Sequence, residues 1–247
     1  RYHPPRTALV EELIRLDAAG VRIGIATGRG GSAGQDLRAV LPAAMHPRIV
    51  VGYYNGSHLA TLDVDLDAHP PSADPAVEAT AAWLATRADL FVTPDYRVRG
   101  RQITIDAEML RQPYRFRRDL LDCPAVSQGR ATVIGSGHSF DIVASDATKL
   151  RVVAALRSLV NDGQEILCFG DSGARTGNDH ALLSHCYGVS VGEVCGAPNG
   201  CWSLFGDSPT GPDALLIALR ALLPLDGGGT RLDVASLSLD SSYQECT

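Results

Sequence analysis

A short apolar strand that runs directly into two spaced carboxylates is the feature that most constrains this chain. Residues 166–169 are all apolar, Gly170 and Asp171 follow them, and a second carboxylate, Asp179, comes eight positions later. Such a run indicates a buried strand of a parallel sheet, and the polar, Gly-rich stretch after it indicates a loop. Open α/β sheets bind their ligands at that edge, so we expect Asp171 and Asp179 to lie at a binding site.

Two carboxylates in one loop repel each other unless a cation lies between them. The sequence places no lysine next to Asp171 or Asp179. Mg²⁺ takes one or two carboxylates together with water and substrate phosphate. The two residues therefore predict a magnesium site, although two aspartates that only cap a polar loop would give the same pattern.

The first part of the chain alternates between helix and strand. Apolar spacing predicts a helix over residues 6–18, closed by Gly20, then a strand over 21–26, a helix over 34–41 and a strand over 49–53. This alternation is typical of an α/β fold with a parallel sheet.

The pattern changes between residue 58 and about residue 137, where helices (76–88 and 110–121) and a short strand (132–134) suggest an inserted α+β domain, and a further short strand is expected over 140–143. After Lys149 the alternation of helix and strand patterns seen in the first part of the chain resumes. We therefore predict the following divisions: a Rossmann-like core of residues 1–57 and 138–224, an inserted domain of residues 58–137, and a loose tail of residues 225–247.

Charge and composition exclude some classes of function. The net charge of −6 argues against a general nucleic-acid binder, and no apolar run approaches the length of a membrane span. The six cysteines are scattered, and none forms a CxxC pair, so neither a zinc site nor a disulfide framework is indicated. Cys168 is expected to be a small buried hydrophobe. A reducing cytoplasm is the expected location.

Two further polar features precede the acidic loop. Thr27, Gly28 and Arg29 follow the strand over 21–26, and a hydroxyl followed by glycines and a helix start can cradle an anion. Lys149 opens a helix, where the helix dipole does not favour a positive charge, so phosphate or a carboxylate is expected to attract it. A plain β–α turn and an exposed surface lysine remain the simpler interpretations.

Two other charged patterns are interpreted as solvent-exposed surface. Asp63, Asp65 and Asp67 alternate, but no apolar strand leads into them. Arginines at positions 111, 115, 117 and 118 could contact an anion but fit a solvated helix face better.

Taken together, these residues resemble the haloacid dehalogenase (HAD) superfamily of phosphohydrolases, in particular its Cof-type and sugar-phosphatase members with a large α+β cap. Its second motif matches Thr27, the Asn-Gly before the cap matches Asn55-Gly56, and the third-motif lysine matches Lys149. The fourth motif, G-D-x-x-N-D, matches Gly170-Asp171 and Asn178-Asp179, with a loop four residues longer.

The resemblance implies a Mg²⁺-dependent phosphatase that acts on a small phosphorylated metabolite of the sugar-phosphate class. In that family a nucleophilic Asp attacks phosphorus and becomes an aspartyl phosphate, while a second Asp serves as general acid and base. By resemblance, Thr27 and Lys149 are catalytic and hold phosphoryl oxygens, and Asp171 and Asp179 place Mg²⁺. The residues expected to bind substrate are Thr27, Gly28, Arg29, Asn55, Lys149 and Asn178.

One family motif is absent. The nucleophile motif, D-x-D-G-T at the end of the first and central strand, should lie before residue 1, whereas Asp63-Val64-Asp65 comes after the second motif and does not take that role. Without this strand two buried strands would be left unpaired, at about 1–3 kcal/mol for each unsatisfied group. The chain also begins with Arg1 rather than Met. We therefore expect about 10–25 further N-terminal residues in the natural protein.

Two alternatives to the phosphatase remain. A non-catalytic module could keep the scaffold without a nucleophile and act in regulation or binding. A dinucleotide-binding enzyme is the weaker alternative, because no G-x-G-x-x-G follows an apolar strand.

Overall fold

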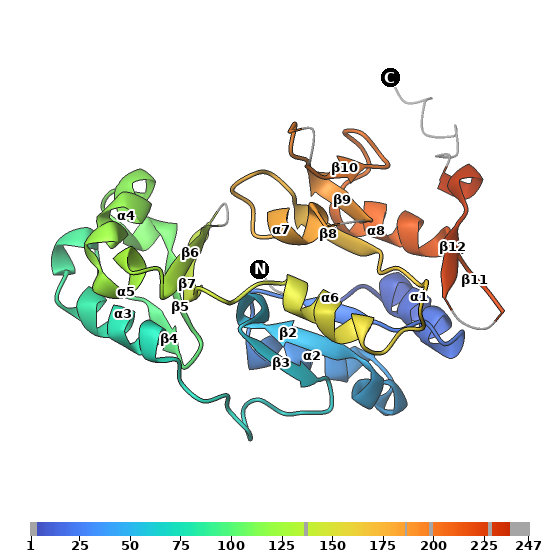
Figure 1. Ribbon diagram of the computed structural model, residues 1–247, viewed down its shortest axis with the longest axis horizontal. Helices are drawn as coiled ribbons and strands as arrows, with labels where there is room; N and C mark the ends of the chain where they lie inside the picture. Colours follow the sequence, from blue (N-terminus) through green and yellow to red (C-terminus); the bar gives the residue numbers. More distant parts are fainter. Residues whose placement is uncertain (1–3, 136–137, 186, 198–199, 227–228, 238–247) are drawn as a thin grey trace.

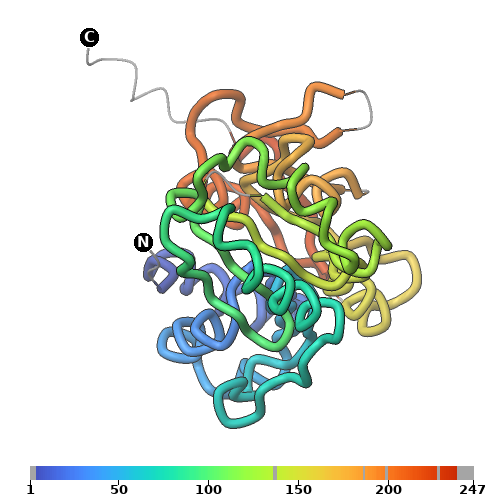
Figure 2. The backbone as a smooth tube through the Cα atoms, turned by 90° about the vertical axis from the view of Figure 1, so that its left-hand side faces the viewer, coloured from blue at the N-terminus to red at the C-terminus, as the bar shows by residue number. Residues whose placement is uncertain are grey.

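The structure is a computed structural model that describes residues 4–135, 138–185, 187–197, 200–226 and 229–237. Strands β4–β7 and helices α3–α5 form one end of the molecule, and the remaining elements form the other (Figure 1). In the second view, which looks from that end, the green trace of the first group lies in front of the rest of the chain (Figure 2). In the part of the chain described, no helix is both long and apolar enough to cross a bilayer.

The N-terminal elements form a three-stranded sheet. Strand β1 (Gly24–Ala26) pairs in parallel with β2 (Val50–Tyr53), which pairs antiparallel with β3 (His58–Thr61). Helices α1 (Thr7–Ala18) and α2 (Gly31–Val40) occur where helices are predicted, with α2 starting three residues earlier than expected. Strand β3 extends this sheet, so residues 58–61, which the prediction assigned to the inserted domain, pair with the core.

The C-terminal elements form a second three-stranded sheet, which is wholly parallel. Its order is β10 (Trp202–Ser203), β9 (Gly188–Glu193) and β8 (Cys168–Ser172). Short helix α7 (His180–Leu183) and helix α8 (Gly211–Arg220) accompany it. Cys168 is buried, as expected, and burial raises the pKa of its thiol to about 11.

Helix α6 (Leu150–Arg157) packs across both sheets. Val152 and Leu156 belong to one apolar cluster with Val50 of β2 and Cys168 of β8. A Cβ atom on Gly24 or Gly52 would lie within 2.6 Å of Val152 side-chain atoms, so the close approach of α6 requires these glycines. On the other face, α1 and α8 pack together through Leu9, Leu16 and Leu219, among others.

A cavity of about 1900 Å³ separates the two sheets. The outer strands β1 and β8 both line it, and within the described residues each is paired on one side only. Residues of α1, α6 and α8 line it as well. The predicted α/β class with parallel-strand sheets is therefore confirmed, and β1 and β8 border the same cavity.

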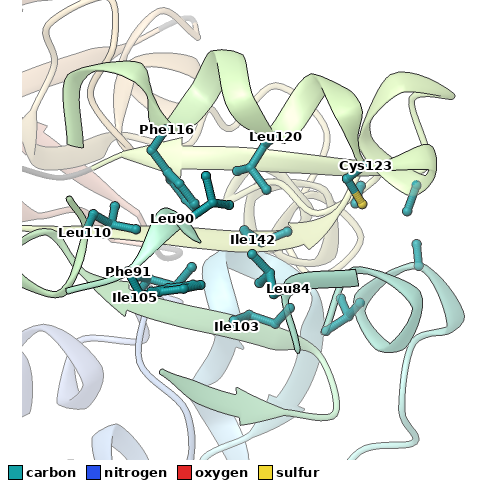
Figure 3. Packing of buried hydrophobic residues seen from close by; sticks show 14 residues of the cluster. Leu84, Leu90, Phe91, Ile103, Ile105, Leu110, Phe116, Leu120, Cys123 and Ile142 are labelled. Carbon is teal, nitrogen blue, oxygen red and sulfur yellow. The ribbon is translucent and has the colours of Figure 1, made fainter. Parts of the chain in front are cut away.

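The other end of the molecule is a four-stranded antiparallel sheet covered by helices. Its order is β4 (Arg97–Arg99), β5 (Gln102–Asp106), β7 (Ser139–Ala144) and β6 (Ala131–Gly135). Helices α3 (Pro75–Ala85), α4 (Pro113–Asp119) and α5 (Pro124–Ser127) cover it. Ile103 and Ile105 alternate with polar residues along β5, and they join Phe91, Phe116 and Ile142 in one apolar cluster (Figure 3). Below, residues 75–144 are called the inserted unit.

Short 3₁₀ helices complete the described elements: η1 (Ala43–Arg48), η2 (Tyr54–Gly56), η3 (Ala88–Leu90), η4 (Ala107–Met109), η5 (Leu120–Asp122) and η6 (Val234–Leu237).

The chain after residue 224 differs from the predicted loose tail. Strand β12 (Thr230–Leu232) pairs antiparallel with β11 (Leu222–Pro224), and Leu232 packs against the cluster that α1 and α8 share. The sequence did not reveal this strand because three residues are too few for a periodic pattern. Residues 238–247 lie outside the described residues.

The two charged patterns interpreted as surface are exposed. Asp63, Asp65 and Asp67 are all exposed and lie in turns after β3 rather than in a strand. Arginines 111, 115, 117 and 118 are likewise exposed.

Candidate functional site

The eight predicted site residues gather at the carboxyl ends of β1, β2 and β8. Seven of them line the 1900 Å³ cavity: Thr27, Gly28, Arg29, Lys149, Asp171, Asn178 and Asp179. The eighth, Asn55, is buried beside Gly28, since a Cβ atom on that glycine would lie 3.3 Å from the Asn55 side chain. The site therefore draws on residues separated by up to 152 positions in the sequence, from Thr27 to Asp179.

Thr27 starts a compact turn after β1. Its Oγ1 accepts a hydrogen bond from the Arg29 amide at 3.0 Å, and its carbonyl accepts one from the Asn55 amide at 2.8 Å. Because the hydroxyl oxygen serves as an acceptor here, its own hydrogen can still be donated to a ligand. The Arg29 guanidinium forms an ion pair with Asp36 of α2 at 2.6 Å, so its charge is partly neutralised.

The Asn-Gly pair after β2 determines where α6 begins. Asn55 has a left-handed backbone (φ 57°), which asparagine tolerates better than most residues. Gly56 has φ 84°, and a Cβ atom there would lie 2.1 Å from the Thr148 carbonyl oxygen. Arg151 of α6 donates to the Gly56 carbonyl at 2.9 Å. These contacts place Lys149, at the start of α6, next to the turn that follows β2.

Lys149 and Asp179 form a buried ion pair. Nζ of Lys149 lies 2.6 Å from Oδ1 of Asp179, and the two side chains are 7% and 8% exposed. The other oxygen, Oδ2, accepts from the amides of Asp171 at 3.1 Å and Ser172 at 3.3 Å. A Cβ atom on Gly170 would lie 2.8 Å from the Asp179 carboxyl group, so glycine is needed there. The charge at the start of α6 is thus held by a carboxylate, as the helix dipole argument predicts.

The surroundings of the two carboxyl groups of the loop shift their pKa values in opposite directions. Burial alone would raise the pKa of Asp179, but Lys149 and the Ser172 amide outweigh it and hold that pKa below its ordinary value. Partial desolvation, and next the charge of Asp179, raise the pKa of Asp171 above its ordinary value. Asp171 therefore carries the less stabilised negative charge of the two.

The sequence argument for a cation between these carboxylates needs revision. It assumed that no lysine lies beside them, whereas Lys149 reaches Asp179 from 30 positions away. Within the described ranges, no group of three or more His, Cys, Asp or Glu side chains could hold a metal ion. Both oxygens of Asp179 already have partners, so Asp171 has more acceptor capacity left for a cation.

The inserted unit supplies part of the cavity wall. Its contribution comes from β4, β5 and β7 and consists of Arg97, Arg99, Gln102, Thr104, Asp106, Ser139 and Asp141. On β5 the polar residues occupy every second position, and this alternation was visible in the sequence. No sequence pattern singled out Asp141.

Three other residues of the inserted unit have structural partners. Tyr96 stacks on Phe91 with ring centroids 5.3 Å apart. Arg101 forms an ion pair with Asp74 at 3.4 Å. Arg117 donates to the Val133 carbonyl at 3.0 Å.

Comparisons with known proteins identify the fold. No protein-family model matches the chain, and no curated protein matches it. Among solved structures it is similar to SMU.1108c from Streptococcus mutans (TM-score 0.53, 13% identity, 74% of this chain and 79% of that one). It is also similar to BT1666 from Bacteroides thetaiotaomicron, a phosphatase of the HAD superfamily (0.51, 18%, 76% and 77%). A third is the C-terminal domain of trehalose-6-phosphate phosphatase from C. albicans (0.57, 13%, 87% and 83%).

Proposed function

We propose that this chain, which has the fold of HAD superfamily phosphatases, forms most of a Mg²⁺-dependent phosphatase for a small phosphorylated metabolite of the sugar-phosphate class. The observation that carries the proposal is the meeting of Thr27, Lys149 and Asp171 on one cavity, each presented by a different element. A hydroxyl, an ammonium and a carboxylate are the groups that phosphoryl transfer needs for binding and charge neutralisation.

Each of these residues has a role that its geometry supports. The Thr27 hydroxyl and the N–H groups of Lys149 not used by Asp179 would donate to phosphoryl oxygens. Asp179 would hold Lys149 in place rather than contact the substrate. Gly28, Arg29 and Asn178 would form the rest of the phosphate pocket. The inserted unit would be the cap that covers the substrate.

Magnesium fits this site through Asp171. A cation would offset the partial desolvation and the repulsion from Asp179 that raise the pKa of Asp171, and Mg²⁺ needs only one or two protein carboxylates when phosphate and water complete its shell. When bound, it would neutralise charge on the transferring phosphoryl group. Asp179 stays part of the proposed metal site as the acceptor that fixes the Asp171 amide.

The nucleophile would come from a strand lying between β1 and β8. A parallel strand there would pair with both outer strands and bring a D-x-D motif at its carboxyl end beside Thr27 and Asp171. One carboxylate oxygen would form a bond to phosphorus as the ester oxygen leaves with a proton from the second Asp. Water would then hydrolyse the aspartyl phosphate and release inorganic phosphate.

The free thiols agree with a reducing location. Four cysteines in the described ranges, Cys123, Cys168, Cys195 and Cys201, form no disulfide. We include the cytoplasm in the proposal on this basis.

The experiment that tests the function adds a strand with the nucleophile motif to the N-terminus of the chain. The chain is produced with an N-terminal extension of about six apolar residues followed by D-x-D-G-T, and with a matched extension in which both Asp residues are Asn. Release of inorganic phosphate from p-nitrophenyl phosphate is measured in MgCl₂ and in EDTA. We expect turnover only with the Asp extension and MgCl₂, and loss of turnover with Asp171→Ala.

One outcome would contradict the proposal. If both extensions raise the unfolding temperature equally but neither gives turnover, the chain is not a phosphatase. If inorganic phosphate then still binds, the non-catalytic module becomes the better account. The intact mass and N-terminal sequence of the natural protein would show independently whether such a strand is present.

A further inference from the structure

A second cavity, of about 430 Å³, lies where the inserted unit meets the core. Its walls come from the start of α2, the turn after β2, the segment that links β3 to α3, and strand β4 with the turn after it. Small-molecule sites in proteins have volumes of about 300–1,000 Å³, so this space is large enough for a small ligand. Below it is called the junction cavity.

Contacts on both sides define the walls of the junction cavity. On the side of the inserted unit, the Asp74 amide donates to the Gly100 carbonyl at 2.7 Å, which ties the linking segment to the β4–β5 turn. On the core side, Tyr54 has a left-handed backbone (φ 53°), which is uncommon for a bulky residue. Its ring lies against Gly30, where a Cβ atom would come within 2.4 Å of Cε1. The cavity is therefore bordered by two anchored segments.

One cation and one anion border this cavity. Of the described residues that line it, only Arg99 and Asp67 carry a formal charge, and both are exposed. The Arg99 guanidinium forms no hydrogen bond and no ion pair with another described residue. Oδ2 of Asp67 accepts from Nε2 of Gln35, and Oδ1 accepts from no side chain or amide in the described ranges. Both charged groups therefore keep positions open for a ligand.

The buried Tyr54 hydroxyl lies close to both charges. Burial raises the pKa of this hydroxyl, the positive charge of Arg99 lowers it, and the negative charge of Asp67 raises it further. A single side chain of the cavity wall thus senses the two opposite charges, which places them on the same small space.

This pair of charges favours a zwitterion. A ligand with one sign of charge would leave either Arg99 or Asp67 without a partner and would be repelled by the other. A carboxylate matches a single guanidinium through two parallel hydrogen bonds, and an ammonium group donates to a carboxylate. A phosphate dianion would find one guanidinium and face Asp67. Pro70 and Pro71 add apolar surface beside these groups.

We propose that the junction cavity binds a small neutral α-amino acid, with its carboxylate on Arg99 and its ammonium group on Asp67. The side chain of the ligand packs against Pro70 and Pro71. This site is separate from the phosphate pocket, and its existence does not depend on phosphatase activity.

The shared arginine connects this site to the function proposed above, and this one consequence rests on that function. Arg99 lines the 1900 Å³ cavity as well as the junction cavity. An amino acid whose carboxylate neutralises Arg99 removes a positive charge from the cavity that takes phosphate. We expect saturating L-alanine to weaken the binding of inorganic phosphate by about fivefold, at the lower end of typical coupling between two sites.

The test compares L-alanine with propionate, which lacks the ammonium group, and with ethylamine, which lacks the carboxylate. Affinities for the natural protein are measured by proton–nitrogen NMR titration, in which the amides of Gly31, Ser32 and Gly100 report on the junction cavity. We expect L-alanine to shift these amides and to bind at least about tenfold more tightly than either analogue, because each analogue loses hydrogen bonds to a charged group.

Matched variants separate recognition from folding. Asp67→Asn should remove the preference for L-alanine over propionate, and Arg99→Gln should remove the preference over ethylamine. A general loss of structure would not change selectivity in these two different ways. Asp63→Asn and Arg130→Gln, on exposed residues outside the junction cavity, should keep both preferences.

Each other outcome overturns a defined claim. If L-alanine shifts none of the three amides, or binds no more tightly than ethylamine, the amino-acid site is refuted and the proposed phosphatase is unaffected. Equal affinity for propionate and L-alanine would refute it in favour of a plain anion site at Arg99. If L-alanine binds but the affinity for phosphate stays the same, the coupling is refuted. If inorganic phosphate does not bind even without L-alanine, the proposed function fails, while the three amides still decide the amino-acid site.

Discussion

The Lys149–Asp179 pair allows the strongest quantitative prediction about this protein. The charged atoms lie 2.6 Å apart with about 7% of each side chain exposed. With an effective dielectric constant of about 20, their attraction is about 6 kcal/mol, and the desolvation of two ions offsets most of it. Removing one partner leaves the other charge buried and alone. We therefore expect Lys149→Met or Asp179→Asn to lower the free energy of unfolding by about 3–5 kcal/mol each.

The double variant distinguishes a true pair from two independent contacts. Lys149→Met combined with Asp179→Asn removes both charges, so its loss should be smaller than the sum of the single losses by about 2–3 kcal/mol. Urea unfolding followed by circular dichroism measures all three values, and constant m-values show that the unfolded states are comparable. Glu165→Gln is the control, because the exposed pair of Glu165 with Arg157 should contribute no more than about 1 kcal/mol. Losses that add within about 0.5 kcal/mol would refute the coupling.

Two other predictions concern the backbone and the pH dependence. Gly56→Ala should lower the unfolding temperature by more than Gly129→Ala. Both glycines have positive φ, but a Cβ atom on Gly56 would lie 2.1 Å from the Thr148 carbonyl oxygen, whereas the space around Gly129 is open. Equal losses would show that the close approach does not matter. Because the pKa of Asp179 is lowered in the folded protein, its carboxylate stabilises the fold at pH values above the ordinary pKa of aspartate, about 4, and this stabilisation is lost as the pH falls through the folded-state pKa. Urea unfolding at a series of pH values should show this loss in the wild type and a smaller loss in Asp179→Asn. Identical profiles for the two proteins would contradict the assignment.

Much of the architecture follows from local pattern. Helices and parallel strands follow from apolar spacing, as with α1 after Pro5 and the run that leads into Gly170. The order of Thr27, Asn55-Gly56, Lys149 and Gly170-Asp171 along the chain was enough to indicate one site. This works because parallel strands of one sheet end at the same edge, so residues that follow those strands meet without further information.

Some features depended on contacts that no local pattern encodes. The sequence left Lys149 as a lysine at an unfavourable helix start, and only the fold shows that Asp179 neutralises it. That contact leaves Asp171 with more acceptor capacity for a cation than Asp179. Strand β12 also formed where a loose tail was expected, because pairing with β11 supplies the hydrogen bonds that three residues cannot supply alone.

The sequence by itself determined the fold class and the chemical types at the site, because strand and helix periods and turn residues are properties of neighbouring positions. The tertiary structure alone decided that α6 packs across both sheets, with Val152 in one apolar cluster with Val50 and Cys168. It alone brought Asp141 within 3.2 Å of Asn55, 86 positions away. Neither fact can be read from neighbours in the chain, since each contact joins elements that are far apart in the sequence.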